Sequence, residues 1–132
     1  MNSISLHHVG VIVDNIERAA KNLPTGALVN DVYDKLQDAR LVLYENFGSS
    51  YLELIQPLSE SSPTWNQLKV NSNHINHFCY TVSNREDAEV MINNLRLLRV
   101  SRWMPALLFP NCEVMFCYSR ASIMIEFLVE SA

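Results

Sequence analysis

The chain has 132 residues, a formal net charge of −4 and a hydrophobic fraction of 48%, which fits one compact domain or two small halves and gives no basic footprint for a nucleic-acid partner. Its apolar runs stop well short of the roughly 18 residues of a membrane span, and the first ten residues, MNSISLHHVG, lack the basic segment and apolar core of a signal peptide. The three cysteines form no CxxC pair and are odd in number, which indicates reduced thiols and a cytoplasmic location.

The first half of the chain predicts a strand, a short helix and three further strands. Residues 6–13 are apolar and rich in β-branched side chains, as in a strand. Asp14 or Asn15 supplies the N-cap of a helix over 16–23, which Pro24 ends early. The remaining strands are expected over 27–33, 39–46 and 50–56, with a hairpin turn at Gly48-Ser49-Ser50.

The second half predicts the same series after a linker. The linker, 57–73, contains two prolines and several serines, and Trp65 and Leu68 within it predict a short packed helix. A strand over 77–82 is followed by a helix over 85–98, capped by Ser83 or Asn84, with apolar residues at helical spacing. The remaining strands are expected over about 100–103, 113–118 and 122–129, with a last turn, Ser119-Arg120-Ala121, that lacks a glycine.

The two halves repeat one sequence pattern. The segments that begin at His8 and His77 share, in register, the histidine and the Val, Asn, Glu and Ala at positions +5, +7, +9 and +11. A second match aligns LELI (52–55) with IEFL (125–128), each with a glutamate inside an apolar strand. A self-similar chain of this kind indicates a duplicated structural unit.

The repeat predicts an α+β fold. Two βαβββ modules, 6–56 and 74–130, are expected to form a half-barrel around a shared cavity, as a single domain over 1–132. Residues two apart in a strand share a face, so His8 lies opposite the Val9, Val11 and Val13 face on which a helix packs.

The same alternation places four polar residues on the faces turned away from the helices, where a half-barrel would have its cavity: His8, Glu53, His77 and Glu126. A buried carboxylate is costly unless it is paired or binds a metal. Two carboxylates and two imidazoles predict a site for one divalent ion, with Zn, Fe, Co, Ni or Mn preferred over Ca. We expect structural or surface roles for His7 and His74. Other cavity residues are candidates for substrate contact: Tyr44, Tyr51, Cys79, Thr81 and Met124.

Four segments together resemble the vicinal oxygen chelate superfamily, which includes glyoxalases, bleomycin-resistance proteins and dioxygenases: LHHVGVIV (6–13), NFGSSYLELIQPLSESSP (46–63), NHFCYTV (76–82) and VMFCYSRASIMIEFLVE (114–130). Within it the chain looks most like methylmalonyl-CoA epimerase and its relatives. The resemblance implies a homodimer, a small-molecule substrate and the same four metal ligands. It also implies an isomerase or lyase that stabilises an enolate beside the carbonyl of an acyl-CoA thioester, with Glu126 as the proton carrier and Glu53 as the other candidate.

The chain departs from this family at two places. Epimerases of this type use a second acid from the strand before the Glu53 strand, but residues 39–44 contain no carboxylate, and Asp38 and Glu45 only flank them. The glycine-rich loop of the second half is replaced by the apolar run 104–110, which fits a lid or pocket wall as well as a core connection or a dimer contact.

Three other functions of the superfamily stay open. A small-molecule binding protein of the bleomycin-resistance type usually lacks the metal set. An extradiol dioxygenase needs two histidines and one carboxylate with open positions, so Glu53 is one ligand too many. A glyoxalase I binds glutathione, and the sequence shows no clear basic cluster for that ligand.

Overall fold

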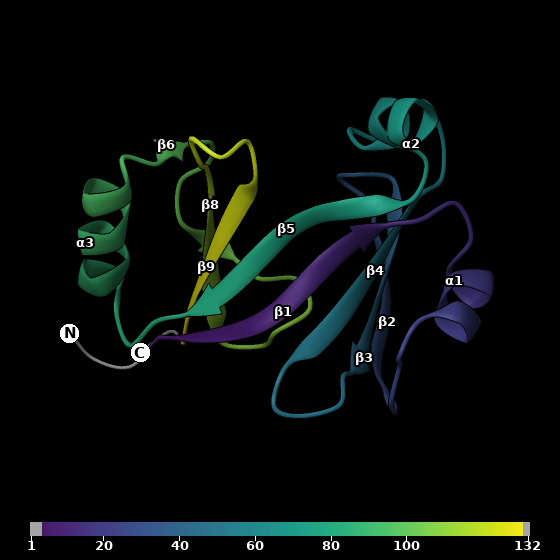
Figure 1. Cartoon of the computed structure of the whole chain (residues 1–132), viewed down its shortest axis with the longest axis horizontal. Coiled ribbons are helices and arrows are strands. Elements are labelled where there is room, and N and C mark those ends of the chain that lie inside the picture. The colour runs from purple at the N-terminus through teal and green to yellow at the C-terminus, as the bar shows by residue number, and fades with distance from the viewer. Residues whose placement is uncertain (1–3, 131–132) are drawn as a thin grey trace. The chain divides into compact units, whose positions relative to one another are not determined.

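A computed structural model of the protein describes residues 4–130 (Figure 1). The chain forms two compact units. The N-terminal unit is His8–Asn76, and the C-terminal unit combines residues 4–7 with residues 77–130. The dividing lines run through the first and the fifth strand, so each of these strands contributes residues to both units.

The N-terminal unit has the predicted βαβββ order, followed by a helix. Its elements are β1 (Ser5–Ile12), α1 (Ile16–Asn22), β2 (Leu28–Asp34), β3 (Ala39–Glu45), β4 (Tyr51–Pro57) and α2 (Trp65–Asn71). The strands lie in the order β2-β3-β4-β1, with β1 parallel to β4 and the other neighbours antiparallel. The helix predicted in the linker is α2, which lies directly before β5 in the chain.

Helix α1 begins where the sequence predicts and ends one residue earlier. The Asn15 side-chain oxygen accepts a hydrogen bond from the Arg18 N–H at 2.8 Å and caps the helix. The helix stops at Asn22, because Pro24 cannot continue it. Ile16 and Ala19 pack with the valines of β1 and the apolar face of β4, so this face of the sheet carries the helix (Figure 1).

Two glycines of the N-terminal unit occupy positions that a side chain would disturb. The Gly26 N–H donates to the Glu45 carbonyl at 2.6 Å, and a Cβ at Gly26 would lie 2.9 Å from that oxygen. Gly48, in the β3–β4 hairpin, has a φ of 108°, which L-residues rarely adopt.

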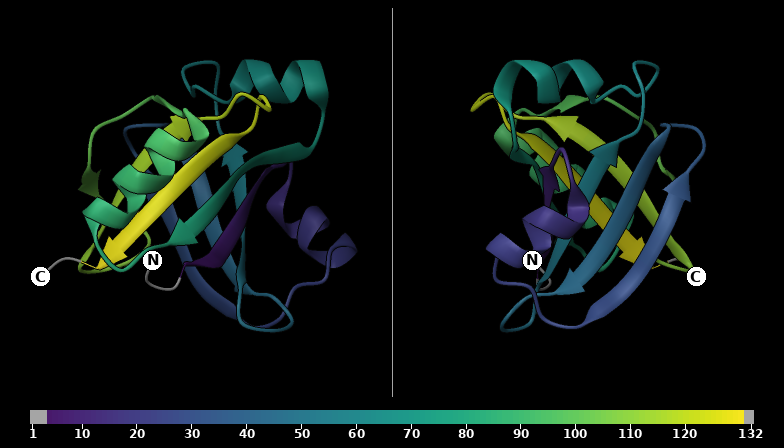
Figure 2. Two further views of the ribbon diagram at one scale, coloured as in Figure 1. Left: turned by 60° about the vertical axis from the view of Figure 1, so that its left-hand side comes forward. Right: turned by 90° about the vertical axis from the view of Figure 1, so that its right-hand side faces the viewer.

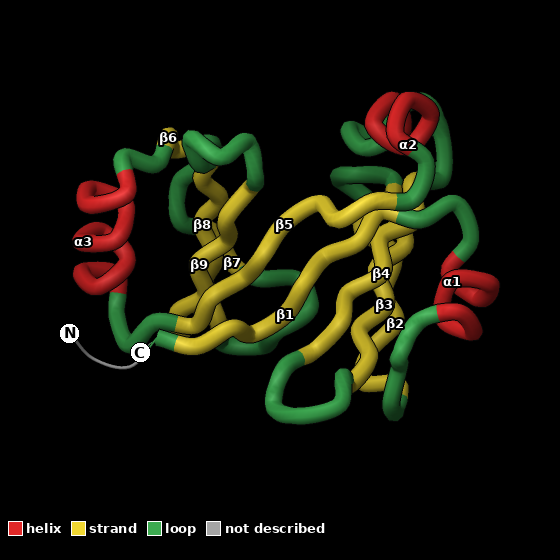
Figure 3. Tube along the Cα trace, viewed as in Figure 1, coloured by secondary structure: helices red, strands yellow, loops and turns green. Residues whose placement is uncertain are grey.

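The C-terminal unit contains β5 (His74–Thr81), α3 (Arg85–Leu95), β6 (Leu98–Arg99), β7 (Met104–Pro105), β8 (Cys112–Tyr118) and β9 (Met124–Glu130). The strands lie in the order β5-β9-β8-β6, with β5 parallel to β9, and β7 also pairs with β8. Figure 3 separates these strands, in yellow, from the helices, in red.

The prediction of a strand over 100–103 is wrong, because this stretch is irregular and separates β6 from β7. The N–H groups of Val100 and Ser101 both donate to the Phe116 carbonyl, at 2.9 and 3.2 Å. The Ser101 hydroxyl then accepts from the Phe116 N–H at 3.0 Å. A serine hydroxyl thus takes the place of a backbone partner, and the regular ladder stops.

Helix α3 ends three residues earlier than predicted. Asn84 caps its start by accepting from the Asp87 N–H at 2.8 Å. Arg96 adopts a left-handed conformation with a φ of 54°, and the Leu97 N–H turns back to the Ile92 carbonyl at 3.0 Å. The helix packs on a core of buried residues that includes Ile92 and Phe127. Figure 2 shows α3, in green, beside the yellow last strand of the chain.

No helix among residues 4–130 is long and apolar enough to cross a membrane.

Candidate functional site

The first candidate feature is a buried pair in the N-terminal unit, His8 on β1 and Glu53 on β4. The His8 Nε2 lies 3.4 Å from the Glu53 Oε1, and the two side chains are 1% and 9% exposed. The core beneath α1 is built from the residues that alternate with them, so the pair lies on the face turned away from α1, as predicted. We call it the N-terminal pair.

The C-terminal unit contains a matching pair, His77 on β5 and Glu126 on β9. The His77 Nε2 lies 3.0 Å from the Glu126 Oε1, and the side chains are 4% and 7% exposed. Phe127 and Val82, which alternate with the pair along the strands, belong to the core beneath α3. This C-terminal pair therefore also lies on the face turned away from its helix.

The strand registers show that the two pairs are equivalent. In the parallel β1–β4 register, Glu53 lies opposite Gly10, two residues after His8. In the parallel β5–β9 register, Glu126 lies opposite Cys79, two residues after His77. The repeat in the sequence is therefore also a repeat in the structure, in which each histidine meets its glutamate diagonally across neighbouring parallel strands.

The four residues of the pairs are among the few buried polar side chains of residues 4–130. The buried polar side chains of residues 4–130 are His8, Asp34, Glu53, Ser62, His77 and Glu126. Asp34 accepts hydrogen bonds from the N–H groups of Leu36 and Gln37 and so closes a turn. Ser62 lies within 3.3 Å of the Thr64 hydroxyl in the turn before α2. The two pairs instead place a carboxylate against an imidazole inside a sheet, which is an arrangement that can bind a metal ion or move a proton.

The surroundings of the two glutamates are largely apolar. Leu43 of β3 lies opposite Glu53 and is 1% exposed. Phe116 of β8 lies opposite Glu126, and its ring meets the His77 imidazole edge-on with centroids 5.7 Å apart. Leu43 and Phe116 offer no side-chain hydrogen bond, so each carboxylate depends on polar partners such as its histidine.

The residues predicted to contact substrate divide between the two faces. Tyr51 shares the face of Glu53, while Cys79, Thr81 and Met124 share the faces of His77 and Glu126. Tyr44 lies opposite Leu52 and packs with the core beneath α1. It therefore lies on the helix-bearing face, and the prediction of substrate contact is kept only for the other four.

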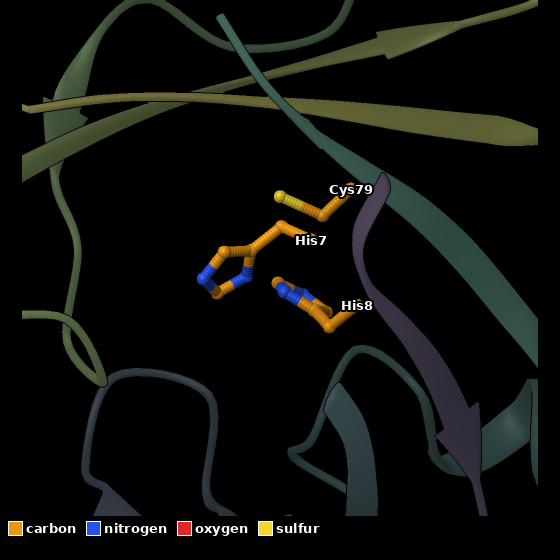
Figure 4. Close-up of side chains that lie close together, drawn as sticks. All are labelled: His7, His8 and Cys79. Atoms are coloured by element: carbon orange, nitrogen blue, oxygen red, sulfur yellow. The ribbon is translucent and has the colours of Figure 1, made fainter. Parts of the chain in front are cut away.

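His7 occupies a place that the sequence did not suggest. Its ring meets Phe109 edge-on with centroids 4.7 Å apart, and one of its nitrogens lies within 4.8 Å of the Cys79 sulfur. Figure 4 shows the His7 ring and the Cys79 thiol side by side. Strict alternation along β1 assigned His7 to the valine face, so no signal in the sequence could have revealed this contact.

Asp38 and Glu45, the two acids that flank β3, have surroundings that differ from those of the pair carboxylates. The Asp38 carboxylate accepts hydrogen bonds from the hydroxyls of Tyr33, Ser59 and Ser61. These bonds, that from Ser59 first, lower the pKa of Asp38. Glu45 is exposed at the end of β3, opposite Tyr51. The middle of β3, beside Glu53, presents Leu43 instead of an acid.

The apolar run 104–110 is partly packed into the C-terminal unit. Met104 and Pro105 pair with β8, and Ala106 and Phe109 pack against the cluster of Cys79, Val114 and Leu128. Leu108 is buried, whereas Leu107 is 56% exposed. This segment therefore forms a wall beside the strand that carries Cys79.

Comparison with known families identifies the fold. The family model described as Glyoxalase/Bleomycin resistance protein/Dioxygenase superfamily matches residues 7–105. Two curated relatives are the mitochondrial methylmalonyl-CoA epimerases of Homo sapiens, 29% identical over 100 residues, and of Mus musculus, 28% identical over 99 residues. Each match covers 73% of this chain and 56% of the relative, so the chain spans little more than half of their length.

Solved structures agree with this assignment. A hypothetical protein from Bacillus halodurans C-125 has a TM-score of 0.82 at 22% identity, with 99% of this chain and 97% of that chain covered. Methylmalonyl-CoA epimerase from Mycobacterium tuberculosis has a TM-score of 0.78 at 20% identity, covering 96% and 88%. A variant of the Streptomyces coelicolor epimerase in complex with 2-nitronate-propionyl-CoA has a TM-score of 0.76 at 15% identity, covering 98% and 100%. The predicted α+β, glyoxalase-like fold class is confirmed, and the chain belongs to the glyoxalase/bleomycin resistance/dioxygenase superfamily.

Proposed function

We propose that this member of the superfamily is a metal-dependent isomerase that removes and returns the proton beside the carbonyl of an acyl-CoA thioester. The observation that supports the proposal most directly is the recurrence of a buried His–Glu pair at equivalent positions of both units. A single such pair is compatible with a structural role, but its repetition in the same register supports the proposal that both pairs serve one purpose.

The donor atoms of the two pairs fit a divalent metal ion, and we propose that the pairs together hold one. Each pair offers an imidazole nitrogen and a carboxylate oxygen, 3.4 Å apart in the N-terminal pair and 3.0 Å apart in the C-terminal pair. Nitrogen and oxygen donors in this proportion suit Zn, Fe, Co, Ni or Mn. When bound, the ion supplies a Lewis acid that polarises the carbonyl oxygen of the substrate.

The proton step falls to a carboxylate of the pairs. In the proposed reaction the substrate Cα–H bond breaks as an O–H bond forms on Glu126, the electron pair of that bond passes into an enolate, and a proton is then returned to either face of the same carbon. Glu53 is the alternative carrier. Leu43 stands where β3 faces Glu53, so for a reaction that inverts the carbon we propose the other pair carboxylate as the second proton carrier.

The substrate class is inferred from relatives. The curated relatives are methylmalonyl-CoA epimerases, and a structural neighbour was solved with 2-nitronate-propionyl-CoA. Both names contain a coenzyme A thioester of a short acyl group, so we propose that class for this chain. Cys79, Thr81, Tyr51 and Met124 share the faces of the pairs and are proposed to contact the acyl group.

The test combines metal analysis with isotope exchange. The purified protein is expected to bind about one divalent ion per chain and to catalyse metal-dependent exchange of deuterium from solvent into C-2 of methylmalonyl-CoA or propionyl-CoA. Glu126→Gln should abolish the exchange, whereas His74→Ala, which removes a histidine outside the pairs, should leave it unchanged. If the wild-type protein neither binds metal nor catalyses the exchange of deuterium, the proposal is overturned and the function of a small-molecule binding protein is favoured.

A further inference from the structure

We propose that the N-terminal unit has a second binding site, for a monocarboxylate with an apolar body, in a cavity beside α1. The cavity measures about 520 Å³, which is within the usual range of pockets for small ligands. Its floor consists of the valine face of β1, Val9, Val11 and Val13, together with Leu52. These residues alternate with His8 and Glu53, so the cavity opens on the opposite face of the sheet from the N-terminal pair.

The shortness of α1 explains why this apolar face is open. The helix ends at Asn22, and Leu23 and Pro24 line one end of the cavity. Val9 and Val11 are therefore only half-buried, although Val13 beneath the helix is 1% exposed. An apolar floor of this kind gains free energy when a hydrocarbon body covers it.

Two amide side chains at the rim are oriented to donate hydrogen bonds. The Asn73 Oδ1 accepts from the Asp14 N–H at 3.0 Å, and the Asn46 Oδ1 accepts from the Phe47 N–H at 3.0 Å. A backbone N–H can only donate, so both amide oxygens have to face the backbone. What Asn46 and Asn73 can offer to a ligand is then their NH₂ groups, and both residues line the cavity.

Arg18 adds a positive charge to the same rim. Its guanidinium approaches the Asp14 carboxylate only at 3.5 Å, and the two side chains are 67% and 55% exposed. A charge-assisted hydrogen bond is normally 2.7–2.9 Å long, so this ion pair holds the guanidinium weakly. A ligand carboxylate can compete with Asp14 for Arg18 and accept from the two amides as well. An apolar floor with a donor-rich rim fits an anion with a hydrocarbon body better than it fits an amine or a sugar.

The test is a titration of the whole protein with octanoate as the probe. Calorimetry measures the binding, and the methyl NMR signals of Val9 and Val11 report where octanoate binds. Octanoate should bind saturably and shift these signals, whereas acetate, which lacks the body, and 1-octanol, which lacks the charge, should bind at least about tenfold more weakly. Equal binding of 1-octanol and octanoate would overturn the carboxylate assignment, and no saturable binding of octanoate would overturn the site.

Two variants locate the site. Asn73→Asp keeps an oxygen for the Asp14 N–H but replaces the NH₂ by a negative charge, so it should weaken octanoate binding at least about tenfold. Asn94→Asp adds the same charge on α3 of the other unit and serves as the matched control. Val11→Phe should fill part of the cavity and abolish binding, and thermal denaturation should show that the variant is still folded. Unchanged binding in either of the cavity variants would contradict the proposal.

The outcome is separable from that of the proposed function. His8→Ala removes a ligand of the proposed metal site on the other face of the sheet, and it should leave octanoate binding unchanged. Loss of octanoate binding in His8→Ala would show that the carboxylate binds at the pairs, and the cavity beside α1 would then be abandoned.

Discussion

The two units differ in the elements that surround their His–Glu pairs. Helix α1 has seven residues and α3 has eleven. After its helix the N-terminal unit has three strands of seven residues each, whereas the C-terminal unit breaks the first of the three into β6 and β7, with two residues each. The pairs themselves are nevertheless placed by the same diagonal register.

The comparison teaches which part of the module sets the site. Each pair comes from the first and the last strand of its unit, and these two strands are hydrogen-bonded neighbours. The helix and the strands further out can therefore shorten or break without changing the strand register that brings the imidazole to the carboxylate.

The largest effect is expected from removing one histidine of a pair. His8→Ala and His77→Ala should each weaken binding of Zn²⁺ or Co²⁺ by more than about 100-fold, since even outer-shell substitutions at metal sites cost about 10–100-fold. Competition with a chelator measures the affinity, and His74→Ala is the control. If one of the two variants keeps wild-type affinity, the units are not equivalent and only one pair binds the ion.

Substitutions in the two cores should rank next. Phe127→Ala in the C-terminal unit should lower the free energy of unfolding by about 3–5 kcal/mol, and Leu54→Ala in the N-terminal unit by about 2–5 kcal/mol, because both side chains are fully buried. Trp65 and Trp103 lie in different units. Each core variant is therefore made in a Trp65→Phe and in a Trp103→Phe background, so that the remaining tryptophan reports the unfolding of one unit in urea. A loss below about 1 kcal/mol for Phe127→Ala would contradict its place in the core.

Smaller effects are expected at the helix caps. Asn15→Ala and Asn84→Ala each remove a side-chain acceptor 2.8 Å from a backbone N–H, and each should cost about 1 kcal/mol in the same denaturation experiment. Asn15→Asp and Asn84→Asp retain the acceptor and serve as controls. If Asn15→Ala has no effect, α1 is held by its packing on the valines rather than by its cap.

The smallest effect is a dependence of stability on pH. The hydrogen bonds from Arg40 lower the pKa of Asp31 in the N-terminal unit, and those from Arg99 lower the pKa of Glu89 in the C-terminal unit. A carboxyl group with a lowered pKa in the folded state stabilises the protein above its ordinary pKa, and this contribution disappears as the pH falls below about 4. Asp31→Asn and Glu89→Gln should each flatten the stability curve below that pH. An unchanged slope would show that these exposed ion pairs contribute nothing.

The faces on which the pair residues lie and the residues at which the helices start could be predicted from the sequence, because both depend on local patterns. Alternation along a strand decides the face of His8 and Glu53, and an Asn before an acidic turn decides where a helix starts. Both kinds of signal are present twice, so each half supports the other.

Features that depend on register or on a single backbone conformation were not readable. The placement of Leu43 opposite Glu53 follows from the β3–β4 hairpin, whose register the sequence does not fix. The break at Ser101 depends on one hydroxyl that replaces a ladder bond, and the early end of α3 depends on the left-handed Arg96. A change of hydrogen-bond partner or of backbone conformation at a single residue leaves no periodic pattern in the sequence.

The diagonal pairing of first and last strand also bears on how the protein folds. The partners are 45 residues apart in the N-terminal pair and 49 residues apart in the C-terminal pair, so neither contact forms early by local collapse. Contacts over such separations slow folding, because the intervening chain has to be ordered first. Each imidazole therefore meets its carboxylate only in a completed module, and incomplete chains lack the paired donors of the proposed metal site.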